Sequence, residues 1–462
     1  MNVGIIGGGA AGLAAAYEFV RNGSQVTVFE RAPFLGGQAS TFGVAGAQLE
    51  RGYHHLFTSD RDMIWLIEEL GLGHKLAWIP SRAGLYHNNR IWPFTTPVDL
   101  LRFSSISLFD RFRLGLTSLY LQRIRDWRRF EGITAAAWLK KRVGTRAYYA
   151  VWEPLLRGKF GQHYDEVGMV WFWGKMALRF ASRGRGMVRE MLGYPMGSFG
   201  EIFDTLGERI RTMGGQVRTG VGVRRVIVES DRAVGIEIDL PGGGSEALQF
   251  DTVLATVPSS IFPRLAPSIP EDYSKQLTGV SYLAAVLMIL VLDRPLTGMY
   301  WLNIADREIP FVGVVEQTNL LSPDHYQGKH IVYLANYLGK DNPLYHMGHS
   351  ELLQAYRPHL RKLNPLFDES WVEESFYHRE EAAQPVIGIN YGDRIPRHRT
   401  PIKDLYLANT TQIYPEDRGT NYSVRLGRKV AHIMLEDKSL PVRDELPLAT
   451  ISNSVTSALD WD

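Results

Sequence analysis

A glycine-rich turn near the N-terminus constrains the fold of this chain more than any other part of its sequence. The apolar residues 3–6 predict a buried strand, and Gly7, Gly9 and Gly12 follow it with G-x-G-x-x-G spacing where an alanine-rich predicted helix begins. Such glycines let the backbone approach a pyrophosphate, whose charge the helix N-terminus stabilises. Glu30 ends the next predicted strand, where an acid bonds a ribose 2′-hydroxyl and would repel a 2′-phosphate. The sequence therefore predicts an α/β domain that binds a dinucleotide.

Composition narrows the remaining classes of protein. At 462 residues the chain exceeds the size of most single hydrophobic cores, so we expect two domains. Its formal net charge is only +2, so we expect no nucleic-acid partner. The chain contains no cysteine, which excludes disulfides, thiolate zinc sites and a cysteine-linked cofactor. We expect no metal site of any kind.

Three segments of the sequence bear on whether the protein enters, crosses or contacts a membrane. The first predicted strand begins at residue 3 and leaves no room for a signal segment, so we expect a cytoplasmic protein. The most apolar run, residues 282–292, is shorter than the ~20 residues that cross a bilayer. Residues 90–130 mix apolar and arginine side chains, so these helices either pack on their own domain or dock on the inner face of a membrane.

Motifs after the first glycines resemble those of one superfamily. Glu30-Arg31 and the stretch 35–40, Leu-Gly-Gly-Gln-Ala-Ser, resemble the double-glycine motif of the flavin amine oxidase superfamily, which includes the protoporphyrinogen oxidases. Four later segments are similar to further motifs of that superfamily: residues 194–199, 217–226, 251–258 and 407–423. The sequence departs from the usual pattern at Gln38, which replaces an arginine, at Ser198, which replaces a glycine, and at Asn409, which replaces an aspartate.

The resemblance implies noncovalent FAD, although attachment through a histidine or tyrosine stays open. It assigns the cofactor to residues of the two glycine motifs, a strand that clasps adenine and the C-terminal motif: Gly7, Gly9, Ala10, Ala11, Gly12, Glu30, Arg31, Gly36, Gly37, Gln38, Val223, Asn409, Asn421 and Tyr422. No second glycine fingerprint appears, so we expect no nicotinamide domain. The electron acceptor and the oligomeric state stay open.

The resemblance also implies the architecture. We expect an α/β fold with a discontinuous Rossmann-like FAD-binding domain and a second, α+β substrate domain made of a mixed sheet and inserted helices. The FAD-binding domain is predicted at residues 1–75, 195–265 and 395–440, the substrate domain at 76–194 and 266–394, and a C-terminal tail at 441–462. Residues 76–193 are predicted to be mostly helical.

The stretch Tyr53-His54-His55 is the candidate catalytic segment. The superfamily runs this part of the chain past the flavin ring, and a similar Gly-x-His stretch occurs in UDP-galactopyranose mutases. If the segment is a strand, the two histidines face opposite sides and do not share a metal. A histidine here would contact substrate or flavin and exchange a proton near neutral pH, or the pair is simply packed.

For the substrate, the cations Arg157 and Lys159 suit an anionic group, and Glu316 lies on a predicted strand at 312–318. The resemblance implies an FAD-dependent oxidoreductase that dehydrogenates a small organic substrate by hydride transfer to flavin N5. Two alternatives stay open: a net nonredox sugar isomerase of the UDP-galactopyranose mutase type, and a binding protein on this fold without catalysis.

Overall fold

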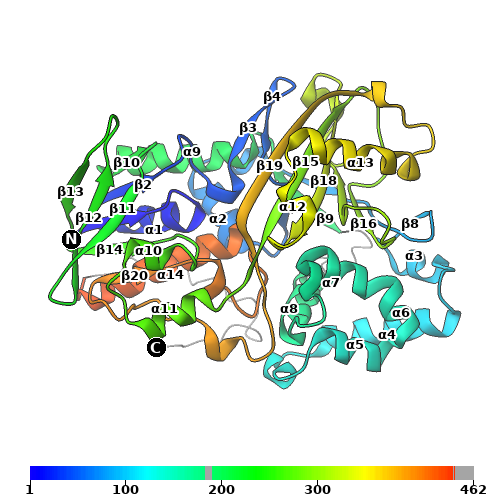
Figure 1. The fold of residues 1–462 in the computed structure, drawn as a ribbon, viewed down its shortest axis with the longest axis horizontal. Helices are drawn as coiled ribbons and strands as arrows, with labels where there is room; N and C mark the ends of the chain where they lie inside the picture. Colours follow the sequence, from blue (N-terminus) through cyan, green and yellow to red (C-terminus); the bar gives the residue numbers. More distant parts are fainter. Residues whose placement is uncertain (183–189, 441, 443–462) are drawn as a thin grey trace.

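A parallel sheet and a larger mixed sheet organise the protein into two lobes (Figure 1). The computed structural model describes residues 1–182, 190–440 and 442. The predicted tail at 441–462 therefore lies outside the described residues except for residue 442. The two sheets correspond to the α/β fold with two different domains that the sequence predicts.

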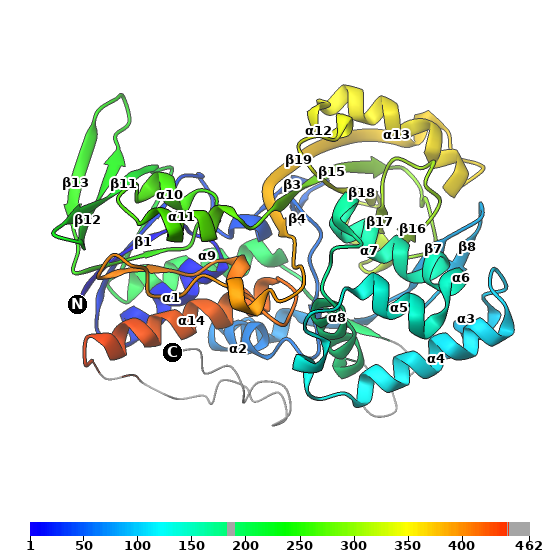
Figure 2. The ribbon, with the colours of Figure 1, turned by 60° about the horizontal axis from the view of Figure 1, so that its bottom comes forward.

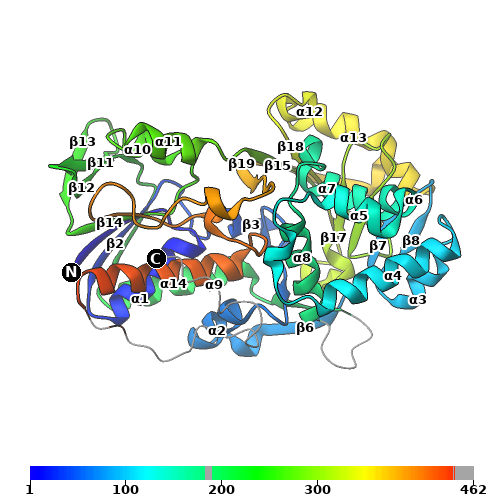
Figure 3. The ribbon, with the colours of Figure 1, turned by 90° about the horizontal axis from the view of Figure 1, so that it is seen from below.

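The first lobe is built on five parallel strands in the order β10-β2-β1-β14-β20. The strands are β1 (Asn2–Ile6), β2 (Gln25–Glu30), β10 (Gln216–Thr219), β14 (Thr252–Ala255) and β20 (Leu405–Leu407). Three helices lie side by side on one face: α1 (Ala10–Arg21), α9 (Ser198–Thr212) and α14 (Thr420–Asp437) (Figure 3). Helices α1 and α14 approach closely at Gly427, which must be glycine because a Cβ there would lie 2.1 Å from the carbonyl oxygen of Ala11.

A three-stranded antiparallel sheet packs on the other face of the parallel sheet. It consists of β11 (Val223–Glu229), β12 (Arg232–Asp239) and β13 (Ser245–Gln249), with α10 (Phe262–Leu265) and α11 (Glu271–Thr278) beside it. Alternate residues of β1 join different cores: Val3 and Ile5 pack with the helices, and Ile6 packs with the small sheet. This alternation is what a strand covered on both faces requires.

The second lobe is built on a seven-stranded mixed sheet in the order β19-β15-β18-β17-β16-β7-β8. Its strands are β7 (Ala83–Tyr86), β8 (Ile91–Pro93), β15 (Tyr282–Leu292), β16 (Trp301–Ile304), β17 (Gly313–Glu316), β18 (His330–Leu338) and β19 (Val372–Pro385). The most apolar run of the sequence is β15, which lies between β19 and β18 and is buried along its length after Tyr282. Helices α12 (Pro343–His346) and α13 (His349–Leu363) lie over this sheet (Figure 1).

A group of helices lies beside the mixed sheet (Figure 2). They are α3 (Pro97–Arg102), α4 (Leu108–Arg123), α5 (Ala135–Val143), α6 (Thr145–Ala147), α7 (Glu153–Phe160) and α8 (Met169–Ser182), with a π-helical turn at Tyr148–Trp152 between α6 and α7. The prediction that helices begin near residue 76 was wrong. Residues 76–93 form β6 (Leu76–Pro80), β7 and β8, because they complete two sheets whose other strands come from distant parts of the chain.

Short elements connect the lobes. Strand β3 (Thr41–Val44) pairs with β4 (Ala47–Glu50), and β9 (Met191–Pro195) pairs with both β5 (Leu56–Phe57) and β6. Helix α2 (Arg61–Glu69) packs on α14. The domain boundaries stay a prediction. The parallel sheet and the mixed sheet each take their strands from the ranges assigned to one domain, whereas the small sheet β5-β9-β6 combines strands from both. Within the described residues, no helix combines the length and the apolar character needed to cross a membrane.

Candidate functional site

The first glycine motif forms a turn that exposes backbone at the carboxyl end of β1. Gly7 has a φ of +112°, a conformation that favours glycine. A Cβ at Gly12 would lie 2.0 Å from the carbonyl oxygen of Gly7, so this helix residue must also be glycine. Helix α1 begins at Ala10 and has no side-chain cap at its N-terminus. Its first backbone N–H groups are therefore available to an anion.

The double glycine lies directly against this turn. Gly9 and Gly36 form a parallel bridge, and the Gly36 N–H donates to the carbonyl of Gly8 at 3.0 Å. Gly37 has a φ of +56°, and a Cβ there would lie 3.2 Å from the Cα of Gly9. The two motifs, separate in sequence, thus form one cradle of backbone with almost no side chains.

Glu30 lies at the edge of this cradle. Its Oε2 accepts a hydrogen bond from the Gly8 N–H at 2.8 Å, and its Oε1 accepts one from the Ala32 N–H at 2.8 Å. Each oxygen can still accept a second bond, as a ribose hydroxyl would require. The Val221 N–H donates to the carbonyl of Glu30 at 2.9 Å, which sets Val223 two residues further along, at the start of β11. Arg31 is exposed beside it.

The C-terminal motif supplies two buried asparagines. Asn421, in the first turn of α14, accepts a bond from the Met63 N–H at 3.0 Å, whereas its buried Nδ2 has no partner among the described residues. Asn409 is saturated by its own loop, since its Nδ2 donates to the Val257 carbonyl at 2.9 Å and its Oδ1 accepts from Thr411 Oγ1 at 2.7 Å. Tyr422 is buried, and burial raises the pKa of its phenol well above the usual value.

These observations fit a dinucleotide cofactor. The glycine cradle leaves room that any side chain would fill, Glu30 offers carboxylate oxygens at its edge, and the Nδ2 of Asn421 lacks the hydrogen bond that a buried donor normally makes. Asn409, in contrast, uses its side chain to hold the loop before α14.

The two histidines were expected on a strand, and that expectation was wrong. Strand β5 starts only at Leu56, so His54 and His55 lie in the extended connection before it. Their side chains nevertheless take different partners. His54 Nδ1 is 2.5 Å from the carbonyl oxygen of Gly52, and His55 Nδ1 is 2.9 Å from the hydroxyl of Tyr300.

The expectation that one histidine exchanges a proton near neutral pH does not fit their burial. Burial lowers the pKa of His54 to about 4, and burial together with the nearby cation of Lys175 lowers the pKa of His55 to about 3. Both imidazoles are therefore neutral at physiological pH. Each can act as a hydrogen-bond partner, and neither acts as a cation.

Arg418, just before α14, connects the two lobes. Its guanidinium donates to Gln384 Oε1 at 2.9 Å, to the Tyr337 hydroxyl at 3.1 Å and to Gln38 Oε1 at 3.4 Å. Gln38 follows the double glycine, whereas Tyr337 belongs to β18 of the mixed sheet. The Tyr53 hydroxyl lies 3.4 Å from that of Tyr337. The network thus brings Gln38 and Tyr53, both predicted site residues, to one place between the lobes.

Two lysines extend this network from the helical group. The Nζ atoms of Lys159 on α7 and Lys175 on α8 lie 3.2 Å and 3.1 Å from Asp417 Oδ2, and Trp171 Nε1 donates to Asp417 Oδ1 at 3.0 Å. Burial lowers the pKa of Lys175. Burial alone would raise the pKa of Asp417, but the two lysines hold it well below its usual value. Lys159 also lies over the ring of Tyr337, 5.4 Å from its centroid.

Tyr337 is the phenol of this cluster whose pKa falls below the usual value. Burial would raise its pKa, but the cations of Lys159 and Arg418 outweigh burial and lower it to about 8. Tyr53 shows the opposite direction, since burial and the neighbouring Tyr337 raise the pKa of its phenol well above the usual value. Of the two hydroxyls, Tyr337 is therefore the one that loses its proton near physiological pH.

The other two predicted substrate residues lie elsewhere. Arg157 contacts Glu153 Oε1 at 3.2 Å and donates to the carbonyl of Ala305 at 3.0 Å. Glu316 is fully buried, and its oxygens accept bonds from the N–H groups of Leu296 and Thr297 at 3.0 and 2.6 Å. Both side chains hold the mixed sheet and its connections together, and the cluster around Tyr337 does not include them.

A buried acid lies where β4, α9 and the mixed sheet meet. Glu50 accepts bonds from the Phe199 N–H at 2.9 Å and from the Tyr194 hydroxyl, and its backbone carbonyl accepts from the Tyr333 hydroxyl at 2.7 Å. Burial raises the pKa of Glu50 to about 7. Ser198, which replaces a glycine of the usual motif, has a φ of +73°, and its buried Oγ has no partner in the described chain. The backbone here keeps the shape that glycine would allow.

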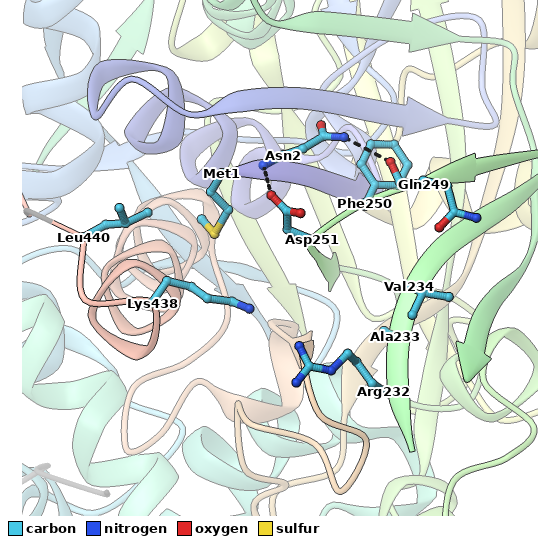
Figure 4. A pocket seen from close by; sticks show the side chains of 10 residues that line it. All are labelled: Met1, Asn2, Arg232, Ala233, Val234, Gln249, Phe250, Asp251, Lys438 and Leu440. Carbon is cyan, nitrogen blue, oxygen red and sulfur yellow. Dashed lines mark hydrogen bonds between the residues drawn. The ribbon is translucent and has the colours of Figure 1, made fainter. Parts of the chain in front are cut away.

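A shallow cleft opens at the opposite edge of the parallel sheet (Figure 4). Met1 and Asp251, at the amino ends of β1 and β14, line it, whereas the glycine cradle lies at the carboxyl ends. Arg232 and Lys438 point toward it, but each forms an ion pair with Asp404 at 2.8 Å. Ligands of open α/β sheets bind at the carboxyl ends of the strands, so this cleft is not the cofactor site. No cluster of potential metal ligands occurs in the described residues.

A family model of the flavin containing amine oxidoreductases matches residues 10–431. Because the match covers most of the chain, the protein belongs to this family, whose members hold a flavin. The superfamily predicted from the glycine motifs is therefore confirmed.

Curated relatives and a solved structure are also similar to this chain. The chain is 28% identical over 182 residues to the coproporphyrinogen III oxidase of Propionibacterium freudenreichii subsp. freudenreichii, covering 36% of this chain and 33% of that protein. It is 24% identical over 181 residues to the zeta-carotene desaturase of Zea mays, covering 34% and 31%. The matched part thus spans about a third of these relatives. Reduced UDP-galactopyranose mutase shares the fold, with a TM-score of 0.72, 16% identity and coverage of 96% of both chains.

The sequence did not point to three residues of the cluster. Arg418 had a signal, because it directly precedes Gly419 in a motif that was recognised. Lys175 and Tyr337 had no such signal in the sequence. Each lies in a helix or strand whose pattern is that of an ordinary packed element, and only the folded structure brings them together.

Proposed function

We propose that the protein is an FAD-dependent oxidoreductase that dehydrogenates a small organic substrate bearing an anionic group. The proposal is based on the three cations that lie between the lobes, next to residues of both flavin motifs. They are Lys159, Lys175 and Arg418, and with Tyr53 and Tyr337 they form what we call the cationic cluster. Family membership supports the flavin, and the names of two relatives, an oxidase and a desaturase, support removal of hydrogen.

The cofactor would be held by the backbone cradle and by Glu30, with α1 directing its N-terminus to the pyrophosphate. When bound, FAD would supply the acceptor for the hydride at N5 of its isoalloxazine ring. Asn421 would donate its unpartnered Nδ2 to the cofactor, and Gln38 would hold Arg418 close to the double glycine.

The cluster has an excess of positive charge. In the described part of the chain, Asp417 is the acid within ion-pair distance of the two lysines, and Arg418 donates to uncharged groups. A carboxylate or phosphate on the substrate would balance this excess, and burial strengthens such a contact because water screens it less. The predicted role of Lys159 is kept in this proposal, whereas Arg157 and Glu316 are left out because of their structural contacts.

Dehydrogenation removes a hydride and a proton, so the site also needs a group that takes the proton. Tyr337 suits this role, because a pKa of about 8 leaves part of the phenol ionised near neutral pH. Tyr53 would support it through the contact between the hydroxyls. His54 and His55 would contact substrate or flavin as neutral hydrogen-bond partners.

The proposal is tested by mixing the flavin-loaded protein anaerobically with a panel of small metabolites and recording flavin absorbance. A substrate with a carboxylate or phosphate should bleach the flavin, and Lys159→Gln should raise the concentration needed for half-maximal bleaching by about tenfold. The matched control Lys340→Gln removes a lysine from a turn after β18 and should change nothing. Turnover of a sugar without bleaching would favour the isomerase alternative, and a protein that holds no flavin would favour the binding protein.

A further inference from the structure

Helix α4 exposes a stripe of apolar side chains to solvent. Leu108, Phe109, Phe112, Leu116 and Leu119 recur at helical spacing, so they share one face of the helix. Phe109 is 69% exposed and Leu116 65% exposed, values far outside those of packed residues. Val98 and Leu101 of the adjoining helix α3 are also exposed and extend the same surface.

The stripe is not needed for packing of the helix on its own domain. The opposite face of α4 contains Leu114 and Leu121, which are each 2% exposed and belong to the core of the helical group. Helix α4 is thus apolar on both faces, and only one face is covered. Soluble proteins seldom gather several large apolar side chains on an open surface without a binding role.

Positive charge is concentrated in the segment that contains the stripe. Residues 91–150 contain eleven lysines and arginines against four acidic residues, whereas the whole chain has a net charge of only +2. Six of these arginines are exposed and form no ion pair within residues 1–182, 190–440 and 442: Arg102, Arg123, Arg125, Arg129, Arg142 and Arg146. Arg113 lies over the ring of Phe109, 5.7 Å from its centroid, so cation and apolar surface are adjacent.

We propose that α3 and α4 form a docking surface for an anionic membrane. The apolar stripe would enter the boundary between headgroups and acyl chains, and the arginines would contact the lipid phosphates. Charge decides between a membrane and a second copy of this chain, because a second copy would bring the same cations against each other. An uncharged membrane would match the stripe but leave the arginines without partners.

The surface is connected to the site between the lobes. Helix α4 packs on α8, and α8 contains Lys175, one of the two lysines that contact Asp417 (Figure 2). Docking would therefore place the helical wall of the proposed substrate site next to the lipid surface. The docking proposal itself does not depend on the identity of the substrate or on catalysis.

The test is flotation of the flavin-loaded protein with vesicles of phosphatidylcholine alone or with 30% phosphatidylglycerol. We expect flotation with the anionic vesicles and little with phosphatidylcholine. The triple variant Phe109→Ser, Phe112→Ser and Leu116→Ser should bind at least tenfold more weakly while keeping its flavin absorbance. The matched control Leu366→Ser removes an 80% exposed apolar residue outside α3 and α4 and should bind like the parent.

The charged half of the proposal is tested with Arg123→Glu and Arg125→Glu in one chain. This double variant should dissociate from anionic vesicles at a lower salt concentration than the parent, because salt screening and charge reversal weaken the same contacts. Parent protein that does not float with anionic vesicles at low salt overturns the proposal. So does a parent dimer that the triple variant converts to a monomer, because the stripe is then covered by a second copy.

Discussion

The glycine cradle and the cationic cluster lie close to each other, joined by the contact between Gln38 and Arg418, but they are built in opposite ways. The cradle is made of backbone from residues 7–12 and 36–37, with Glu30 as its main side chain. The cluster is made of side chains from Tyr53, Lys159, Lys175, Tyr337 and Arg418, which come from five separate segments. A site made of backbone requires glycine at closely spaced positions and so leaves a motif in the sequence. A site made of side chains from distant segments leaves no such motif.

The difference predicts that chemistry depends on the cluster and cofactor content on the cradle. Tyr337→Phe should therefore have the largest effect, slowing flavin reduction by roughly 10²–10⁴-fold while the flavin stays bound. The parent rate should rise with pH through about 8 and level off above it, because the phenolate accepts the proton. Single-turnover reduction across pH measures both effects.

Tyr149→Phe is the matched control, since Tyr149 is an exposed tyrosine of the same lobe. A Tyr337→Phe protein that keeps the parent rate and pH profile would remove the tyrosine from the mechanism.

Glu50 is buried between the lobes and belongs neither to the cradle nor to the cluster. Its pKa is 4.5 when unfolded and about 7 when folded, so the folded state holds the proton more tightly and the parent loses stability as pH rises from 4.5 to 7. Glu50→Gln removes this loss and should stabilise the protein by about 3 kcal/mol above pH 7, with little effect near pH 4.5.

Urea unfolding at several pH values measures the difference, with the exposed Glu229→Gln as control. A stability gain that does not grow between pH 4.5 and 7 would mean that Glu50 titrates normally.

Substitution of Glu30 in the cradle, Glu30→Ala, should lower the affinity for FAD and leave the chemistry unchanged. Losing a charge-assisted bond to ribose should weaken FAD binding by about 1.5–3 kcal/mol, without changing the reduction rate of the fraction that holds flavin. Fluorescence titration of the apoprotein with FAD measures the affinity. An unchanged affinity would show that Glu30 only fixes the turn through Gly8 and Ala32.

The smallest effect is expected at the histidines. Because both are neutral, His54→Ala and His55→Ala should each slow reduction by about fivefold or less, as for the loss of one ordinary hydrogen bond. Flavin reduction in a single turnover separates the two variants. A loss of a hundredfold or more in either variant would show that the histidine exchanges a proton during the reaction.

The sequence was sufficient for the cradle and for the outline of the fold. Gly7, Gly12 and Gly37 are required by local backbone geometry, so the motif and its structure coincide. The strand expected at Tyr53–His55 failed because that segment is fixed by contacts with Tyr300 and Tyr337, more than 200 residues away. The cluster could not be predicted for the same reason, because its residues are far apart in the sequence. No local pattern distinguishes Lys175 or Tyr337 from packed residues.

The identity of the flavin released from the purified protein is the decisive test of FAD binding in the glycine cradle. We predict that heat or acid releases FAD, about one per chain. Gly9→Val should lose the FAD, whereas Gly298→Val, at a position where a Cβ meets nothing within 4 Å, should retain it. Release of FMN, or no flavin bound after refolding with excess FAD, would show that the glycine cradle does not bind FAD.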